Sequence, residues 1–296
     1  MSELPPGGLI VVDKPAGLTS HDVVARVRRI AHTRRVGHAG TLDPMATGVL
    51  VLGVERATKL LGHLTLTDKT YAATIRLGQD TVTDDAEGEP TGGASAAAVT
   101  PEELAKGLDA LTGVILQVPS AVSAIKVNGQ RSYARVRAGE QVELAARTVT
   151  VSRLELLGWS RPAPDLLDAD VELDCSSGTY VRALARDLGR ALGTGGHLSA
   201  LRRTRVGPFT LAGAVTLEAL AERPEPVSVP LDAAVAAAFP RRELDADEAG
   251  RVRNGGRLTA AGLPGPYGAF DPDGHAIALL EDHDTSARPL VVLRPA

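Results

Sequence analysis

The chain of 296 residues contains one cysteine, Cys175, so no internal disulfide can form, and this fits a reducing compartment. Its first residues show no basic segment followed by an apolar stretch, and no apolar run approaches the roughly 20 residues that cross a bilayer. These absences predict a cytoplasmic protein that has no membrane contact.

The seven histidines and the single cysteine form no cluster with zinc-ligand spacing, and no Walker or dinucleotide-binding fingerprint occurs. The acidic run from Asp80 to Asp85 lacks the alternating ligands, central glycine and closing glutamate of a calcium loop, so we interpret it as a passage from strand to loop. Cys175 ends an alternating apolar strand and is interpreted as a small buried residue. The sequence therefore predicts no metal and no organic cofactor.

The formal net charge of −4 argues weakly against a nucleic-acid partner. Phosphate binding depends on local potential, however, and arginines crowd residues 26–35 and 182–205, whereas acidic residues crowd residues 80–103. The same arginines could equally lie on solvated helix faces. Charge alone leaves the partner open.

The most informative segment that is present runs from Gly37 to Leu50. It holds a single carboxylate, Asp43, together with His38, three glycines and Pro44, and it leads directly into an apolar run. Glycines permit close backbone approach, and Pro44 biases the acid toward an extended conformation. Such a loop can display a catalytic acid, although an Asp-Pro turn before a core strand is the structural alternative.

Strands are predicted over the apolar or alternating segments Leu9–Val12, Val49–Val54, Tyr71–Leu77, Ala124–Val127, Arg147–Leu157, Leu166–Leu173 and His197–Val206. Helices are predicted over His21–Ala31 with Ser20 as N-cap, Arg56–Leu64, Pro101–Leu111, Arg131–Ala138, Tyr180–Leu192, Leu217–Glu222 and Leu231–Phe239. Because the order lacks a regular strand–helix alternation, we expect an α+β fold with a mixed, largely antiparallel sheet flanked by helices. Domains are predicted at residues 1–240 and 241–296, the second being small and β-rich.

Several long motifs, in order, resemble those of the TruB family of tRNA pseudouridine synthases. They are the segment around Asp43, Val12–Asp22, Lys69–Tyr71, Pro119–Lys126 and Cys175–Arg182. The resemblance implies a pseudouridine synthase-like fold for residues 1–240, and by position it implies a PUA-like RNA-binding module for the tail.

The resemblance also implies roles for individual residues. Asp43 is implied as the essential acid, Arg182 as its guanidinium partner and Tyr71 as the ring that stacks on the base. His38 is implied to help extrude the uridine from its loop. The remaining residues implied in substrate binding are Lys14, Gly40, Thr41, Lys126 and Tyr180.

Several of these residues also have an ordinary structural interpretation, and His38 could be a loop histidine that is hydrogen-bonded to the backbone. Tyr71 and Tyr180 could be core aromatics, and the two lysines could lie on the surface or maintain a loop. Arg182 could be a surface arginine, although the first turn of a helix is an unfavourable place for a cation.

The function predicted in this way is isomerisation of the T-loop uridine, position 55, of tRNA to pseudouridine by a monomer that needs no protein partner. The reaction breaks the N1–C1′ bond, turns the base and joins C5 to C1′. Either a nucleophilic adduct or a glycal intermediate could carry it. A tRNA-folding factor with secondary catalysis and a guide-RNA-dependent synthase are the alternatives.

Overall fold

The computed structural model describes residues 7–120, 126–127, 130–131 and 144–296. The chain forms two compact units, which are described separately. Unit 1 comprises Met1–Pro44, Gly48–Thr67 and Arg205–Ala296, and unit 2 comprises Met45–Thr47 and Asp68–Thr204. The helix expected over Arg131–Ala138, beyond its first residue, lies outside the described residues.

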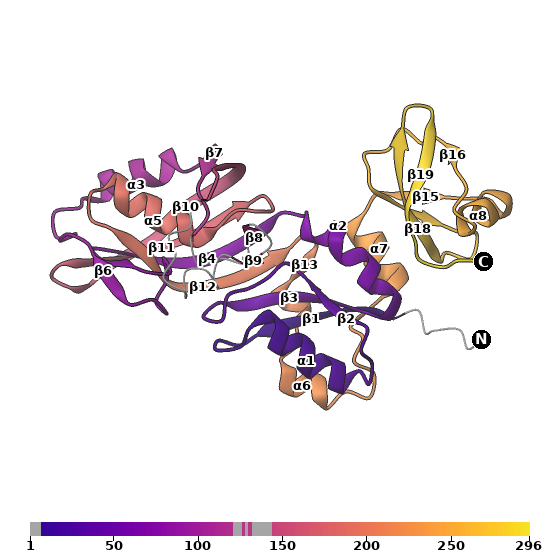
Figure 1. Ribbon diagram of the computed structural model, residues 1–296, viewed down its shortest axis with the longest axis horizontal. Helices are drawn as coiled ribbons and strands as arrows, with labels where there is room; N and C mark the ends of the chain where they lie inside the picture. The colour runs from indigo at the N-terminus through magenta and orange to yellow at the C-terminus, as the bar shows by residue number, and fades with distance from the viewer. Residues whose placement is uncertain (1–6, 121–125, 128–129, 132–143) are drawn as a thin grey trace. The chain divides into compact units, whose positions relative to one another are not determined.

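The first strands of unit 1 pair antiparallel (Figure 1). β1 (Gly8–Lys14) pairs along its length with β3 (Thr47–Val54), and its first residues pair with β14 (Val229–Pro230). β2 (Val36–Ala39) also pairs antiparallel with β3. The apolar runs of β1 and β3 are almost fully buried, as expected for strands covered on both faces.

Helix α1 (Ser20–Ile30) begins one residue before the predicted range. Its N-cap is Thr19, whose side chain accepts a hydrogen bond from the Asp22 N–H while the Asp22 carboxylate accepts one from the Thr19 N–H. The prediction of Ser20 as N-cap is therefore wrong, because the capping box needs an acid three residues after the cap. Ser20 is instead the first helical residue. Unit 1 also contains the 3₁₀ segments η1 (Glu55–Leu60) and η2 (Leu211–Gly213) and the short helices α2 (Leu61–Thr65), α6 (Leu217–Ala221) and α7 (Leu231–Ala238).

The end of unit 1 is a five-stranded sheet with one helix, α8 (Ala246–Arg253). In spatial order its strands are β15 (Arg241–Glu243), β17 (Tyr267–Phe270), β18 (Ala276–His283), β19 (Ser286–Val292) and β16 (Leu258–Thr259). β15 and β17 are parallel, and the other pairs are antiparallel. The sheet confirms the β-rich C-terminal region.

This sheet has apolar contacts on two sides. Tyr267 and Ile277 belong to a core of the segment's own, together with Val252 of α8. Phe270 and Leu279 belong instead to a cluster that includes residues of β1, β3 and α7. Because side chains from both sides of residue 240 share that cluster, the boundary between the predicted domains stays a prediction.

Unit 2 contains a long antiparallel sheet with helices packed against it (Figure 1). Its strands, in spatial order, are β12 (Gly196–Val206, whose last two residues belong to unit 1), β4 (Lys69–Leu77), β11 (Leu166–Cys175), β10 (Arg147–Ala163) and β7 (Gly113–Gln117). The short strands are β5 (Asp80–Thr81), paired with β6 (Pro90–Gly92), β8 (Lys126–Val127), paired with β9 (Gln130–Arg131), and, in unit 1, β13 (Phe209–Thr210), paired with the end of β12.

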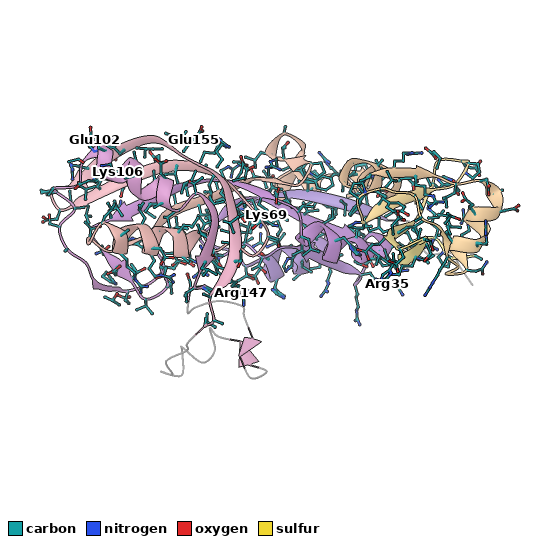
Figure 2. All side chains as sticks on the ribbon, turned by 90° about the horizontal axis from the view of Figure 1, so that it is seen from above. Arg35, Lys69, Glu102, Lys106, Arg147 and Glu155 are labelled. Carbon is teal, nitrogen blue, oxygen red and sulfur yellow. The ribbon has the colours of Figure 1, made fainter. Side chains whose placement is uncertain are left out.

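Two helices pack with the sheet of unit 2. α3 (Pro101–Ala110) carries a capping box at Thr100 and contacts β10, and α5 (Val181–Ala191) contacts both α3 and β4. Glu102 and Lys106, labelled in Figure 2, lie one turn apart on the exposed side of α3. The predicted α+β class with a mixed, largely antiparallel arrangement is confirmed.

Candidate active site

Asp43 lies in the connection between β2 and β3 in unit 1, and its side chain is half-buried. Gly40, at φ 87°, and Gly48, at φ 100°, flank this connection in backbone conformations that favour glycine. His38, however, belongs to β2 and pairs with Leu52 of β3. The expected loop is therefore shorter than the motif, and it begins after Ala39.

The N-terminal motif holds this connection from one side. Lys14 is fully buried, and its Nζ donates to the carbonyl oxygens of Pro15 at 2.9 Å, Leu18 at 2.6 Å and Pro44 at 3.2 Å. The Gly17 N–H donates to the Pro44 carbonyl oxygen as well, at 2.8 Å. The residue after Asp43 is thus tied to the segment after β1.

The half-buried ring of His38 meets His21 of α1 edge-on, with ring centroids 5.5 Å apart and planes at 78°. Thr41 is exposed and Gly40 is half-buried. Both lie in the short segment that leads to Asp43. All these residues belong to unit 1.

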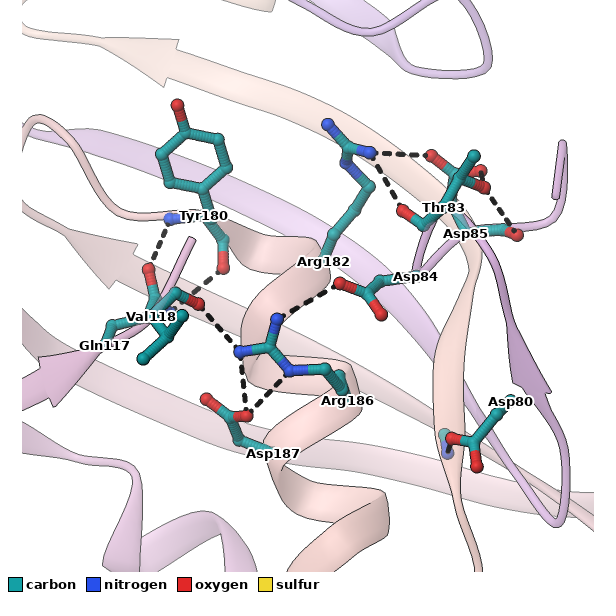
Figure 3. Close-up of polar contacts among 11 residues, drawn as sticks. Asp80, Thr83, Asp84, Asp85, Gln117, Val118, Tyr180, Arg182, Arg186 and Asp187 are labelled. Carbon is teal, nitrogen blue, oxygen red and sulfur yellow. Dashed lines mark hydrogen bonds and ion pairs between the residues drawn. The ribbon is translucent and has the colours of Figure 1, made fainter. Parts of the chain in front are cut away.

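The arginine of the motif lies in unit 2, in the first turn of α5. Arg182 is 6% exposed, and its Nη1 donates to the Thr83 carbonyl oxygen at 2.9 Å and lies 3.3 Å from Asp85 Oδ2 (Figure 3). Asp85 is itself 2% exposed. A buried carboxylate thus offsets the unfavourable interaction of this cation with the helix N-terminus.

One turn later, Arg186 repeats the arrangement. Its Nη1 lies 3.2 Å from Asp84 Oδ2, and its Nη2 donates to the Val118 carbonyl oxygen at 2.7 Å (Figure 3). Burial raises the pKa of Asp84, and the nearby Arg186 and Arg182 partly oppose that shift. Sequence reasoning missed both aspartates as arginine partners. No local pattern reports these pairs, because each acid lies far from its arginine in the sequence.

Tyr180 immediately precedes α5, and its backbone is held by one side chain. Gln117 accepts a hydrogen bond from the Tyr180 N–H at 2.8 Å and donates one to its carbonyl oxygen at 3.1 Å (Figure 3). Gln117 is 2% exposed, and it ends β7. The start of the arginine helix is therefore fixed by the sheet.

Tyr71 lies in β4, opposite Leu173 of β11, and is 7% exposed. Two residues earlier on the same face, Lys69 (Figure 2) is 6% exposed and pairs in register with Cys175. Burial, followed by the charge of Arg203, lowers the pKa of Lys69 to about 8. Burial also raises the pKa of Cys175 to about 11, and the thiol is 1% exposed, which confirms that Cys175 is a buried residue.

The predicted site residues are divided between the two units. Unit 1 contains Asp43 with the four other residues Lys14, His38, Gly40 and Thr41. Unit 2 contains Tyr71, Tyr180, Arg182 and Lys126, of which Lys126 lies in β8 with its side chain outside the described residues. That these residues act together stays a prediction.

Within the ranges that the structure describes, no group of three or more His, Cys, Asp or Glu side chains could hold a metal ion. The acids between Asp80 and Asp85 contact protein groups. Asp80 accepts a hydrogen bond from the Gly196 N–H at 3.0 Å, and Asp84 and Asp85 contact arginines. None of the helices in the described part of the chain is long and apolar enough to span a bilayer.

A family profile described as "TruB family pseudouridylate synthase (N terminal domain)" matches residues 28–181. The chain belongs to the TruB family. Profiles described as "tRNA pseudouridylate synthase B C-terminal domain" and "tRNA Pseudouridine synthase II, C terminal" match residues 182–235 and 239–294. The predicted family and enzyme class, an isomerase of the pseudouridine synthase type, are confirmed.

Relatives support the same conclusion over nearly the whole chain. Proteins named tRNA pseudouridine synthase B from Rhodococcus jostii (strain RHA1) and Nocardia farcinica (strain IFM 10152) are 62% and 63% identical, covering 98% of this chain and 94% of each relative. Among solved structures, a Cbf5-Nop10-Gar1 complex contains a chain with a TM-score of 0.75 and 26% identity, covering 98% of this chain and 86% of that one. A chain of the archaeal box H/ACA sRNP Nop10-Cbf5 complex has a TM-score of 0.72 and 25% identity, over 98% and 87%.

Proposed function

We propose that this TruB family member isomerises the T-loop uridine, position 55, of tRNA to pseudouridine in the cytoplasm, with Asp43 as the essential acid. The observation that carries the proposal is the placement of Asp43. It is half-buried between two residues whose backbone is held in place, and the chain is about 60% identical to proteins named tRNA pseudouridine synthase B.

The chemistry makes different demands on each residue. Asp43 has to be ionised to attack the substrate or to stabilise positive charge at C1′ when the N1–C1′ bond breaks. Arg182 would favour the charged form of that acid through a guanidinium contact, and Tyr71 would stack on the uracil or remove the proton from C5. After the C5–C1′ bond forms, C5 loses its proton and N1, released from C1′, takes up a proton, so the product is an isomer of the substrate.

Access to the uridine requires that the base leave the stack of the T loop. His38 is suited to fill the vacated space, because its ring is half-buried at the end of a strand and meets His21 edge-on. Gly40 and Thr41 line the approach to Asp43, and Lys126 and Tyr180 would contact the substrate from unit 2. Lys14 would act through the loop, since its ammonium donates to three carbonyl oxygens.

The C-terminal segment 241–296 would bind RNA as a PUA-like module. Its five-stranded sheet and the separate profile match to residues 239–294 support this assignment. The protein would act as a monomer and need no protein partner or cofactor.

The proposal is tested by release of tritium from T-arm RNA labelled at C5 of its uridines. The wild-type chain should release one equivalent per RNA, and Asp43→Asn should release none above background. Release by the variant at the wild-type rate would contradict the role of Asp43.

A guide-directed synthase is the second candidate, because the fold also matches a chain of an archaeal box H/ACA sRNP complex. The purified chain alone should modify bare tRNA if it acts independently. Activity that appears only with an added RNA and partner proteins would favour the guide-directed reaction.

A further inference from the structure

The hydroxyl of Ser20 makes two hydrogen bonds to a single residue, Leu42. Ser20 Oγ accepts from the Leu42 N–H at 2.9 Å and donates to the Leu42 carbonyl oxygen at 3.1 Å. Ser20 is 1% exposed and Leu42 is 3% exposed, so water competes poorly for these groups. The two residues are 22 positions apart in the chain, and one side chain replaces the backbone pairing that this irregular segment lacks.

The two bonded groups of Leu42 belong to different peptide planes. Its N–H is part of the peptide that follows Thr41, whereas its carbonyl is part of the peptide that carries the Asp43 nitrogen. The hydroxyl therefore restricts both planes at once. On the other side of Asp43, the Pro44 carbonyl oxygen accepts from Lys14 Nζ and from the Gly17 N–H.

Asp43 is thus fixed on both sides by the same short segment, from Lys14 to Ser20, while its own side chain remains half-buried. Ser20 is not used by α1 as a cap, because Thr19 performs that task. Its position as the first helical residue instead aims the hydroxyl at the loop before the acid.

We propose that Ser20 is a positioning residue for Asp43, whose hydroxyl sets the orientation of the carboxylate by fixing the peptides on either side of Leu42. The proposal rests on the proposed function of Asp43. Because a reacting group displaced by about 1 Å can cost on the order of 10²-fold in rate, Ser20→Ala should lower the isomerisation rate constant roughly 10- to 100-fold. The affinity for RNA should change by less than about threefold, since the hydroxyl acts on orientation and is not exposed.

Two sets of matched variants separate positioning from helix stability. Thr19→Ala removes the N-cap of the same helix, at a cost of roughly 1 kcal/mol, and leaves the Leu42 contacts in place. Ser20→Thr and Ser20→Val have the same shape, and only the threonine variant keeps a hydroxyl. The threonine variant should be at least about tenfold faster than the valine variant if the hydroxyl is what matters.

The experiment measures single-turnover rate constants and dissociation constants on T-arm RNA, together with hydrogen exchange of the Leu42 amide in the free protein. Exchange should be at least about tenfold faster in Ser20→Ala and Ser20→Val than in the wild type or Thr19→Ala. Equal rates for the threonine and valine variants, or an equal loss in Thr19→Ala and Ser20→Ala, would overturn the proposal. Faster Leu42 exchange without a slower reaction would overturn it too.

The exchange measurement does not depend on catalysis. A wild-type chain that makes no pseudouridine would refute the proposed function, whereas the Leu42 exchange rates would still report whether Ser20 holds the loop.

Discussion

The chain holds its two predicted charged catalytic residues in different ways. Around Asp43 the contacts involve the main chain: the Leu42 and Pro44 carbonyl oxygens accept from Ser20, Lys14 and Gly17, and the Leu42 N–H donates to the Ser20 hydroxyl. Hydrogen bonds to neutral backbone groups fix the conformation of the main chain. They do not determine the protonation state of the Asp43 carboxylate, which depends on its other neighbours.

Around Arg182 the acceptors include buried carboxylates. Asp85 contacts Arg182, and Asp84 contacts Arg186 one turn later on α5. Such pairs fix a side chain and its charge together, and they become costly when one partner is lost. The main chain on either side of the acid is therefore held by hydrogen bonds, whereas the side chain of Arg182 is held in part by an ion pair.

The largest expected effect separates the two arginines of α5, which are 6% and 8% exposed. Arg182→Lys should lower the isomerisation rate on the order of 10²-fold, because an ammonium cannot present two parallel N–H donors. Arg186→Lys should stay within roughly tenfold of the wild type, because its contacts serve the fold. Single-turnover kinetics on T-arm RNA measure both. Equal losses would show that the two arginines do not differ in role.

Removal of the carboxylate next to Arg182 should weaken the fold more than removal of any exposed acid. Asp85→Asn should lower the free energy of unfolding by roughly 3–5 kcal/mol, since it removes a buried carboxylate that contacts the buried guanidinium of Arg182. The control is Asp168→Asn, which breaks the pair with Arg76 at 2.7 Å where the side chains are 15% and 29% exposed, and which should cost roughly 1 kcal/mol. Urea unfolding tests both, and similar costs would contradict the importance of burial.

Lys14→Met tests how much the hydrogen bonds from Lys14 to backbone carbonyl oxygens stabilise the fold. The variant removes three hydrogen bonds that the fully buried Lys14 ammonium donates to carbonyl oxygens, and it should lower the free energy of unfolding by roughly 1–3 kcal/mol. Lys106→Met, on the exposed side of α3, should change it by less than about 0.5 kcal/mol. Equally small changes in the free energy of unfolding for both variants, measured in urea, would show that the contacts of Lys14 do not stabilise the fold.

The smallest expected effect is the pH dependence of stability that the buried Lys69 causes. The pKa of Lys69 falls from 10.5 to about 8 on folding, so the unfolded chain binds more protons between these values and stability rises with pH there. Below about pH 8 Lys69 is charged in the folded chain, and the full free-energy cost of burying that charge lowers the stability. Relative to Lys69→Met, the wild type should gain about 1 kcal/mol of unfolding free energy between pH 7 and pH 9. A constant difference in urea unfolding across that range would contradict the shift.

Regular elements with strong patterns could be predicted from the sequence. The alternation in Tyr71–Leu77 and the near-continuous apolar run after Gly48 each gave a strand, and Pro101 marked the start of a helix. β2 was not predicted, because it has only four residues and includes a glycine, and its pairing with β3 is a tertiary property.

For the candidate site, the sequence motifs name Asp43 and Arg182, whose roles stay predictions, but they do not give the supporting contacts. The partnership of Arg182 with Asp85 joins residues 97 positions apart, and no local pattern reports it. The error at Ser20 has a similar origin. Thr19 and Ser20 are both good caps, and only the tertiary contact with Leu42 shows why the second hydroxyl is used elsewhere.

The central claim is that Asp43 of this chain converts one uridine of the tRNA T loop to pseudouridine. Chemical mapping of pseudouridine in full-length unmodified tRNA, incubated with the wild type or with Asp43→Asn, tests it most directly. We expect a single new pseudouridine at position 55 with the wild type and none with the variant, a loss of at least about 10³-fold. Pseudouridine at another position, or at position 55 with both proteins, would contradict it.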